Sequence, residues 1–75
     1  MKGKDHFTQH EIATLRRLIR IRVELSQQSG TKNEQKKVRD RMRSIGFYGG
    51  DDWGIFDCQE SDLDRLIDSG LIKVE

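Results

Sequence analysis

The fold is decided by residues 7–25, FTQHEIATLRRLIRIRVEL. Thr8 is followed three residues later by Glu11, which is the spacing of a capping box, where each side chain accepts a hydrogen bond from the other residue's backbone N–H. Phe7 stands just before the cap and can pack on Ile12 in the first turns. Both signals predict a helix that begins at Thr8 and continues to Leu25.

The apolar residues of this helix form two adjacent stripes when successive residues are placed about 100° apart. The first stripe holds Ile12, Leu15, Ile19 and Val23, and the second holds Leu18, Ile21 and Leu25. Together they cover roughly 200° of the helix, about twice the usual width of the apolar face of a surface helix. We therefore expect other elements to cover this helix on two sides.

A second helix is predicted after the polar segment 26–30. Thr31 and Glu34 repeat the capping-box spacing, and Gly46 suits the left-handed conformation that often ends a helix. The apolar stripe of this helix is narrow and consists of Val38, Met42 and Ile45. Two helices joined by so short a segment should pack as a helical hairpin.

The remaining third of the chain predicts short elements. Residues 47–56 contain three glycines among aromatic and acidic residues, which favours two extended pieces around a tight turn, with an irregular loop as the alternative. Asp57 or Ser61 can cap a third helix that ends at Gly70. Residues 71–74 have the composition of a terminal strand.

These elements predict an α+β fold, a small helix-rich domain with a helical hairpin, a third helix and a short sheet of two or three strands. We expect Ile55 and Phe56 to pair with the strand at 71–74. Residues 1–6 are polar and should form a flexible N-terminal segment. Residues 7–75 should form a single domain.

Charge is divided between the two parts of the chain. Residues 1–46 carry 12 basic and 5 acidic side chains, a net charge of +7, whereas residues 47–75 carry 2 basic and 8 acidic ones, a net charge of −6. Such a division indicates either a basic surface for a polyanion or two halves that neutralise each other. Arg22 projects between the two apolar stripes, and we expect it to reach water or to pair with a carboxylate of the acidic half.

The basic residues of the second helix are the sharpest candidate for a binding site. Their spacing places four of them within about 60° of one another, on the face opposite the apolar stripe. These four are Lys32, Lys36, Arg39 and Arg43, and the first helix adds Arg16, Arg17 and Arg20 on its polar face. Cations arranged in this way can hold the phosphates of a nucleic acid. The alternative is a solvated face, partly paired with Asp40 and Glu34.

Other kinds of chemistry have weak support in the sequence. Asp51 and Asp52 lack the alternating ligands of a calcium loop, and His6, His10 and Cys58 do not have the spacing of a zinc site. We expect no metal, no cofactor and no enzymatic activity. A single cysteine, no signal-peptide pattern and no long apolar run predict a cytoplasmic location without membrane contact.

The wide apolar arc of the first helix sets our first functional expectation, which is a non-enzymatic binding or adaptor domain acting through protein contacts or as a homodimer. Apolar surface that a small domain leaves uncovered marks interfaces. The residues expected there are Leu18, Ile21 and Leu25. The rival expectation is a small regulatory nucleic-acid-binding module that uses the basic face of the second helix.

Overall fold

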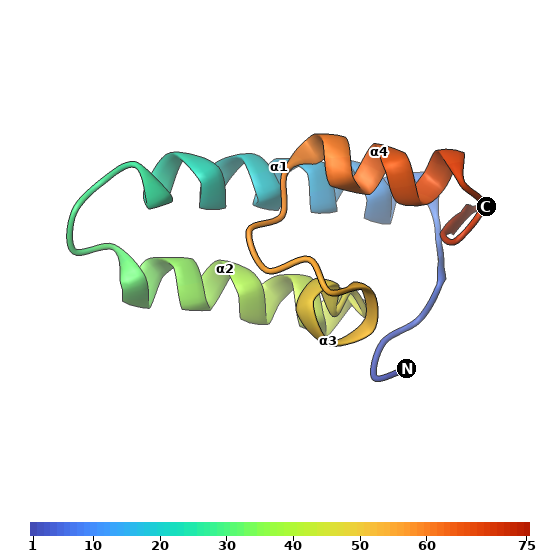
Figure 1. The fold of residues 1–75 in the computed structure, drawn as a ribbon, viewed down its shortest axis with the longest axis horizontal. Coiled ribbons are helices and arrows are strands. Elements are labelled where there is room, and N and C mark those ends of the chain that lie inside the picture. Colours follow the sequence, from blue (N-terminus) through green and yellow to red (C-terminus); the bar gives the residue numbers. More distant parts are fainter.

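The computed structural model describes residues 1–75 as four helices and two short strands (Figure 1). In chain order these are β1 (His6–Phe7), α1 (Gln9–Ser26), α2 (Lys32–Ile45), α3 (Gly49–Trp53), α4 (Glu60–Asp68) and β2 (Lys73–Val74). This architecture confirms the predicted α+β class with its helical hairpin. No helix combines the length and the apolar character that crossing a bilayer requires.

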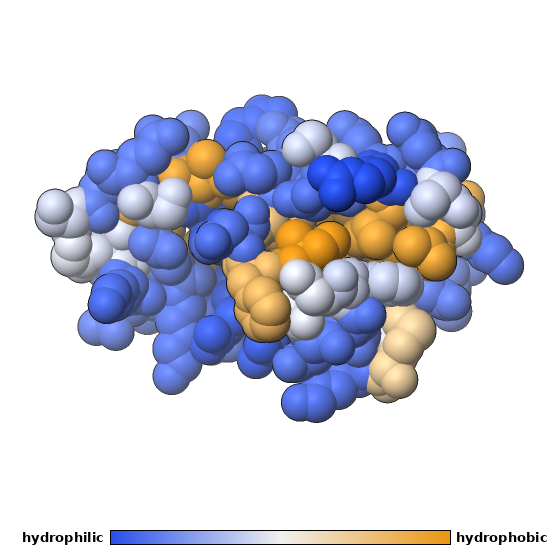
Figure 2. All heavy atoms as spheres, viewed as in Figure 1, coloured by the Kyte–Doolittle hydropathy of each residue, from blue (hydrophilic) through white to orange (hydrophobic).

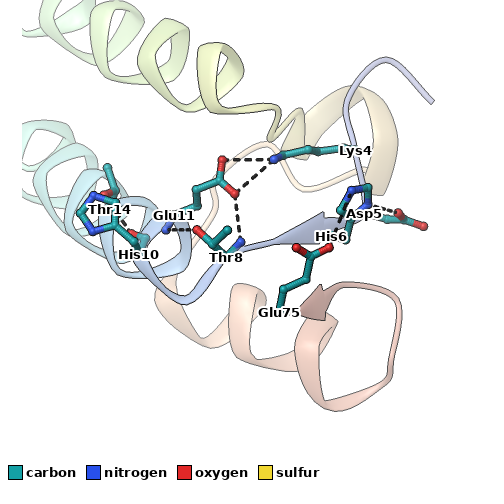
Figure 3. A network of polar contacts seen from close by, with 8 residues as sticks. All are labelled: Lys4, Asp5, His6, Thr8, His10, Glu11, Thr14 and Glu75. Carbon is teal, nitrogen blue, oxygen red and sulfur yellow. Dashed lines mark hydrogen bonds and ion pairs between the residues drawn. The ribbon is translucent and has the colours of Figure 1, made fainter.

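Helix α1 begins as the sequence predicts. The N–H of Glu11 donates to Thr8 Oγ1 at 3.1 Å, and the N–H of Thr8 donates to Glu11 Oε1 at 2.9 Å, which completes the capping box (Figure 3). Lys4 Nζ also donates to both oxygens of the Glu11 carboxylate, at 3.1 and 3.2 Å. These donors, first the Thr8 N–H and then Lys4, lower the pKa of Glu11.

Helix α1 is covered on two sides, as its wide apolar arc requires. Helix α2 runs back alongside it, and α4 lies beside its N-terminal part (Figure 1). Ile12, Leu15 and Ile19 of the first stripe are buried, and Val23 packs against the core. The outer end of the hairpin extends beyond α3 and α4, which gives the molecule its elongated dimensions of 36 × 21 × 21 Å.

The predicted capping box at the start of α2 is wrong, because Thr31 serves the preceding helix instead. Its side chain makes no capping bond to α2. The Thr31 hydroxyl donates to the carbonyl of Leu25, and it also lies 3.1 Å from the carbonyl of Gln28. Thr31 thus adds a second hydrogen bond to the Leu25 carbonyl, which also accepts from the Gln28 N–H at 3.0 Å, and so helps to close the C-terminal end of α1. Helix α2 ends at Gly46, whose φ of 111° is left-handed, as predicted.

The extended hairpin predicted for residues 47–56 is also wrong, because the chain forms the single turn of α3 there. The N–H groups of Asp52 and Gly54 donate to the carbonyls four residues earlier, at 2.9 and 3.1 Å. A Cβ atom on Gly50 would lie 3.0 Å from the ring of Phe56. Gly50 therefore lets the ring of Phe56 come close to the backbone, and it does not form a hairpin turn.

Helix α4 and strand β2 have different partners from those predicted. The N-cap of α4 is Gln59, not Asp57 or Ser61, and its N–H donates to the carboxylate of Asp62 at 2.8 Å. The predicted pairing of Ile55 and Phe56 with the terminal strand is wrong. Strand β2 instead pairs in parallel with β1, in the register His6 with Lys73 and Phe7 with Val74.

The N-terminal segment lies along α3 and the end of α2. The N–H groups of Lys2 and Gly3 donate to the carboxylate of Asp52 at 2.7 and 2.8 Å, and the N–H of Lys4 donates to the Gly46 carbonyl at 2.9 Å. These contacts place residues 1–6 against the domain. The flexible N-terminal segment expected from the sequence concerns motion in solution, and it stays a prediction.

Candidate functional site

A partly open pocket lies between α2, the second half of α1 and the segment that follows α3. Its volume is about 370 Å³, which falls in the range of roughly 300–1,000 Å³ that small-ligand sites occupy. The cations that line it are Arg22, Lys32, Lys36, Arg39 and Arg43, and we call it the cationic pocket. Asp51 is the single acidic residue among the lining side chains. The pocket therefore favours an anion.

Four of these cations come from α2, and the structure brings together the four that the sequence predicts. Arg39 Nε lies 3.7 Å from Asp40, and Arg43 Nη2 lies 3.6 Å from Asp51. Neither Lys32 nor Lys36 forms an ion pair, and Asp40 pairs with Arg39 rather than with Lys36. Much of the positive charge of this face is therefore free to meet a ligand.

Arg22 reaches the pocket from α1, on the opposite side from α2. Its side chain is only 12% exposed, and its Nη2 lies 4.0 Å from Asp57, so the predicted pairing with the acidic half is a long one. Nη2 also donates to the Cys58 carbonyl at 3.5 Å, whereas the buried Nε has no partner. A guanidinium has five N–H donors. With these donors, the Arg22 side chain makes one hydrogen bond to another group of the protein.

An apolar wall completes the pocket. Met42 of α2 and Phe47, which follows α2, form one part of this wall. The segment between α3 and α4 forms the other part with Ile55, Phe56 and Cys58. Figure 2 shows apolar surface gathered between α3 and α4, bordered by hydrophilic surface. Phe56 is 79% exposed, although its ring lies against Gly50. The sequence does not single out Phe56 as a site residue, because residues 55 and 56 resemble a strand. The nearby glycines were the available signal that an aromatic ring packs closely against the backbone here.

The cations predicted on α1 do not reach this pocket. Arg16 donates to Asp64, and Arg20 Nη2 donates to Glu60 at 3.0 Å, so two of them face carboxylates of α4. Arg17 is exposed and forms no ion pair. The hydrogen bond from Arg16 lowers the pKa of Asp64. The acidic half of the chain thus neutralises much of the basic face of α1.

The predicted apolar interface on α1 is only partly accessible. Leu18 is buried, with 3% of its surface exposed, whereas Ile21 is 38% exposed. Leu25 is half-buried and packs against the core. The accessible apolar surface at this position is therefore centred on Ile21.

Cys58 contributes its side chain to the pocket wall but not a reactive thiolate. The side chain is buried, and burial, followed by the nearby charge of Asp62, raises its pKa to about 11. The thiol is therefore protonated at neutral pH, and only the thiolate is a nucleophile.

Comparison of the chain with models of protein families, with curated proteins and with solved structures found no match.

Proposed function

We propose that this domain is a non-enzymatic module that binds nucleic acid by holding its phosphates along α2. The observation that carries the proposal is the gathering of five cations around one pocket that has a single acidic side chain in its lining. Lysine and arginine side chains gain binding free energy at a phosphate backbone because condensed counterions are released. The free ammonium groups of Lys32 and Lys36 are placed to contribute in this way.

The contrast between the two hairpin helices supports the same proposal. On α1, Arg16 and Arg20 already face carboxylates of α4. On α2, the ion pairs of Arg39 and Arg43 are longer, at 3.7 and 3.6 Å, and long pairs between partly exposed side chains contribute little free energy. Phosphates can therefore replace these carboxylates at a small cost.

The lining of the pocket favours binding over catalysis. General acid–base chemistry needs a positioned group that titrates near the working pH. The lining contains no histidine, its one carboxylate is that of Asp51, and the Cys58 thiol is protonated. We therefore assign the pocket a binding role.

Retardation of a labelled oligonucleotide in a native gel at about 50 mM salt, where phosphate contacts are strong, tests this proposal. The double variant Lys32→Gln/Lys36→Gln should bind roughly tenfold or more weakly than the wild type. The matched control is Lys37→Gln/Arg41→Gln, which removes the same charge from the same helix outside the pocket and should bind nearly as well as the wild type. Absence of retardation by the wild type would refute the proposal.

A second candidate is protein contact or self-association through the exposed apolar surface at Ile21. The supporting observation is that Ile21, in the second half of α1, is 38% exposed. Sedimentation at micromolar concentration tests it. A wild-type dimer that Ile21→Glu converts to a monomer would support this candidate, and a wild-type monomer would count against a homodimer.

A further inference from the structure

We infer that the cationic pocket receives one unpaired nucleotide of a single strand, with a phosphate at Arg22 and the base against Phe56. This inference rests on the proposed nucleic-acid function and adds the class of nucleic acid. Arg22 and Phe56 come from segments that are far apart in the sequence, and both line the same pocket.

Arg22 supplies the argument for a phosphate inside the pocket. Its side chain is 12% exposed, its two protein contacts measure 3.5 and 4.0 Å, and its Nε lacks a partner. Buried polar groups are almost always hydrogen-bonded, so an incomplete set of partners calls for an explanation. The planar fork of a guanidinium matches the oxygens of a phosphate. A phosphate in the pocket would bind at the Nη end of the guanidinium, whose protein contacts are long, while the buried Nε stays out of its reach.

Phe56 supplies the argument for a base. Burial of a phenylalanine side chain is favourable, yet 79% of this one is exposed beside the pocket. Gly50 lies against the ring on one side, where a Cβ would come within 3.0 Å of two ring carbons. The exposed part of the ring offers a surface on which a base can stack, as aromatic residues do in proteins that bind single strands.

The size of the pocket favours one unpaired nucleotide over a duplex. A volume of about 370 Å³ is at the small end of ligand sites and suits a single nucleotide. Within a duplex, neighbouring bases cover both faces of each internal base, so stacking such a base on Phe56 would require unpairing at a cost of a few kcal/mol. Single strands present their bases without this cost.

Fluorescence anisotropy with two labelled probes tests the inference: an oligothymidine of about 12 nucleotides and a blunt duplex of equal length. The wild type should bind the single strand more tightly than the duplex at equal salt. Phe56→Ala should weaken single-strand binding by roughly 5- to 150-fold, the effect that one stacked base has, and change duplex binding by less than about twofold.

Leu71→Ala is the matched control, because Leu71 is also a large exposed side chain, at 53%, but lies outside the pocket. It should change neither affinity. Thymidine monophosphate should displace the strand at lower concentration than inorganic phosphate, which lacks a base. Far-UV circular dichroism checks that each variant is folded.

The outcomes separate this inference from the proposed function. If the wild type binds either probe in a salt-dependent way and Phe56→Ala binds the single strand equally well, the inference is wrong and the proposed function stands. Tighter binding of the duplex than of the single strand also overturns the inference. If the wild type binds neither probe, both are wrong.

Discussion

At the scale of single residues, Arg22 combines a side chain that is 12% exposed with few hydrogen-bond partners in the protein. Removing a buried charge that lacks close partners costs little stability, and an apolar side chain of similar volume can even stabilise the fold. We therefore expect Arg22→Met to keep the free energy of unfolding within about 0.5 kcal/mol of the wild type or to raise it. The same change should weaken oligonucleotide binding.

Urea unfolding and anisotropy, measured on the same samples, check this prediction. Arg22→Lys is the control, because it keeps the charge but lacks the planar fork, and its affinity should lie between those of the wild type and Arg22→Met. A loss of more than about 2 kcal/mol in Arg22→Met would instead identify Arg22 as a structural residue whose long contacts hold α1 to the segment after α3.

At the scale of elements, the start of α1 depends on the reciprocal hydrogen bonds of Thr8 and Glu11. Thr8→Ala removes one of them and should lower the free energy of unfolding by about 1 kcal/mol. Thr8→Ser retains the hydroxyl and should lower it much less. Urea unfolding followed by the fluorescence of Trp53, the only tryptophan, measures both variants. Equal stability of Thr8→Ala and the wild type would show that the capping box does not stabilise α1.

The long helices were predictable because their ends depend on residues that are close in the sequence. Contacts between residues far apart in the sequence have no comparable pattern. The capping box of α1 and the glycine that ends α2 involve residues within one or two turns, so their spacing is visible in the sequence. Strand β2 pairs with β1 from the other end of the chain, and two-residue strands are too short to show alternation. Thr31 was misassigned because its hydroxyl reaches back to the preceding helix.

The part of the candidate site that lies on one helix was predictable, and the part that other segments contribute was not. Lys32, Lys36, Arg39 and Arg43 recur at helical spacing on one element, so their common face followed from periodicity. Arg22 joins them because α1 packs beside α2, and Phe56 joins them because the segment after α3 leads back across the hairpin to α4 (Figure 1). That path depends on the turn of α3, where the glycine-rich sequence favours extended pieces instead.

At the scale of the whole molecule, two paired carboxylates couple stability to pH, one within the basic half and one between the two halves. The pKa values of Glu11 and Asp64 are lowered in the folded protein, the first by the Thr8 N–H and Lys4 and the second by Arg16. A group with a lowered folded pKa stabilises the fold above its unfolded pKa, and this stabilisation is lost as the pH falls through the folded pKa. Stability should therefore change little between about pH 7 and 5 and fall below about pH 4.5.

Urea unfolding at a series of pH values measures this dependence. The double variant Glu11→Gln/Asp64→Asn should be less stable at neutral pH and should show a shallower loss of stability in acid. A wild type that is equally stable at about pH 3 and pH 7 would contradict the contribution of these ion pairs.

The central claim is that α4 pairs with Arg16 and Arg20 of α1 while the cations of α2 stay available for phosphates. The slope of log affinity against log salt concentration for an oligonucleotide tests it most directly, because the slope counts the phosphates that the protein contacts. We predict a slope of about −3 to −4 for the wild type and for Arg16→Gln/Arg20→Gln, and about −1 or shallower for the variant with glutamine at positions 32, 36, 39 and 43. A flat slope in the wild type, or a greater reduction from the α1 variant than from the α2 variant, would contradict the claim.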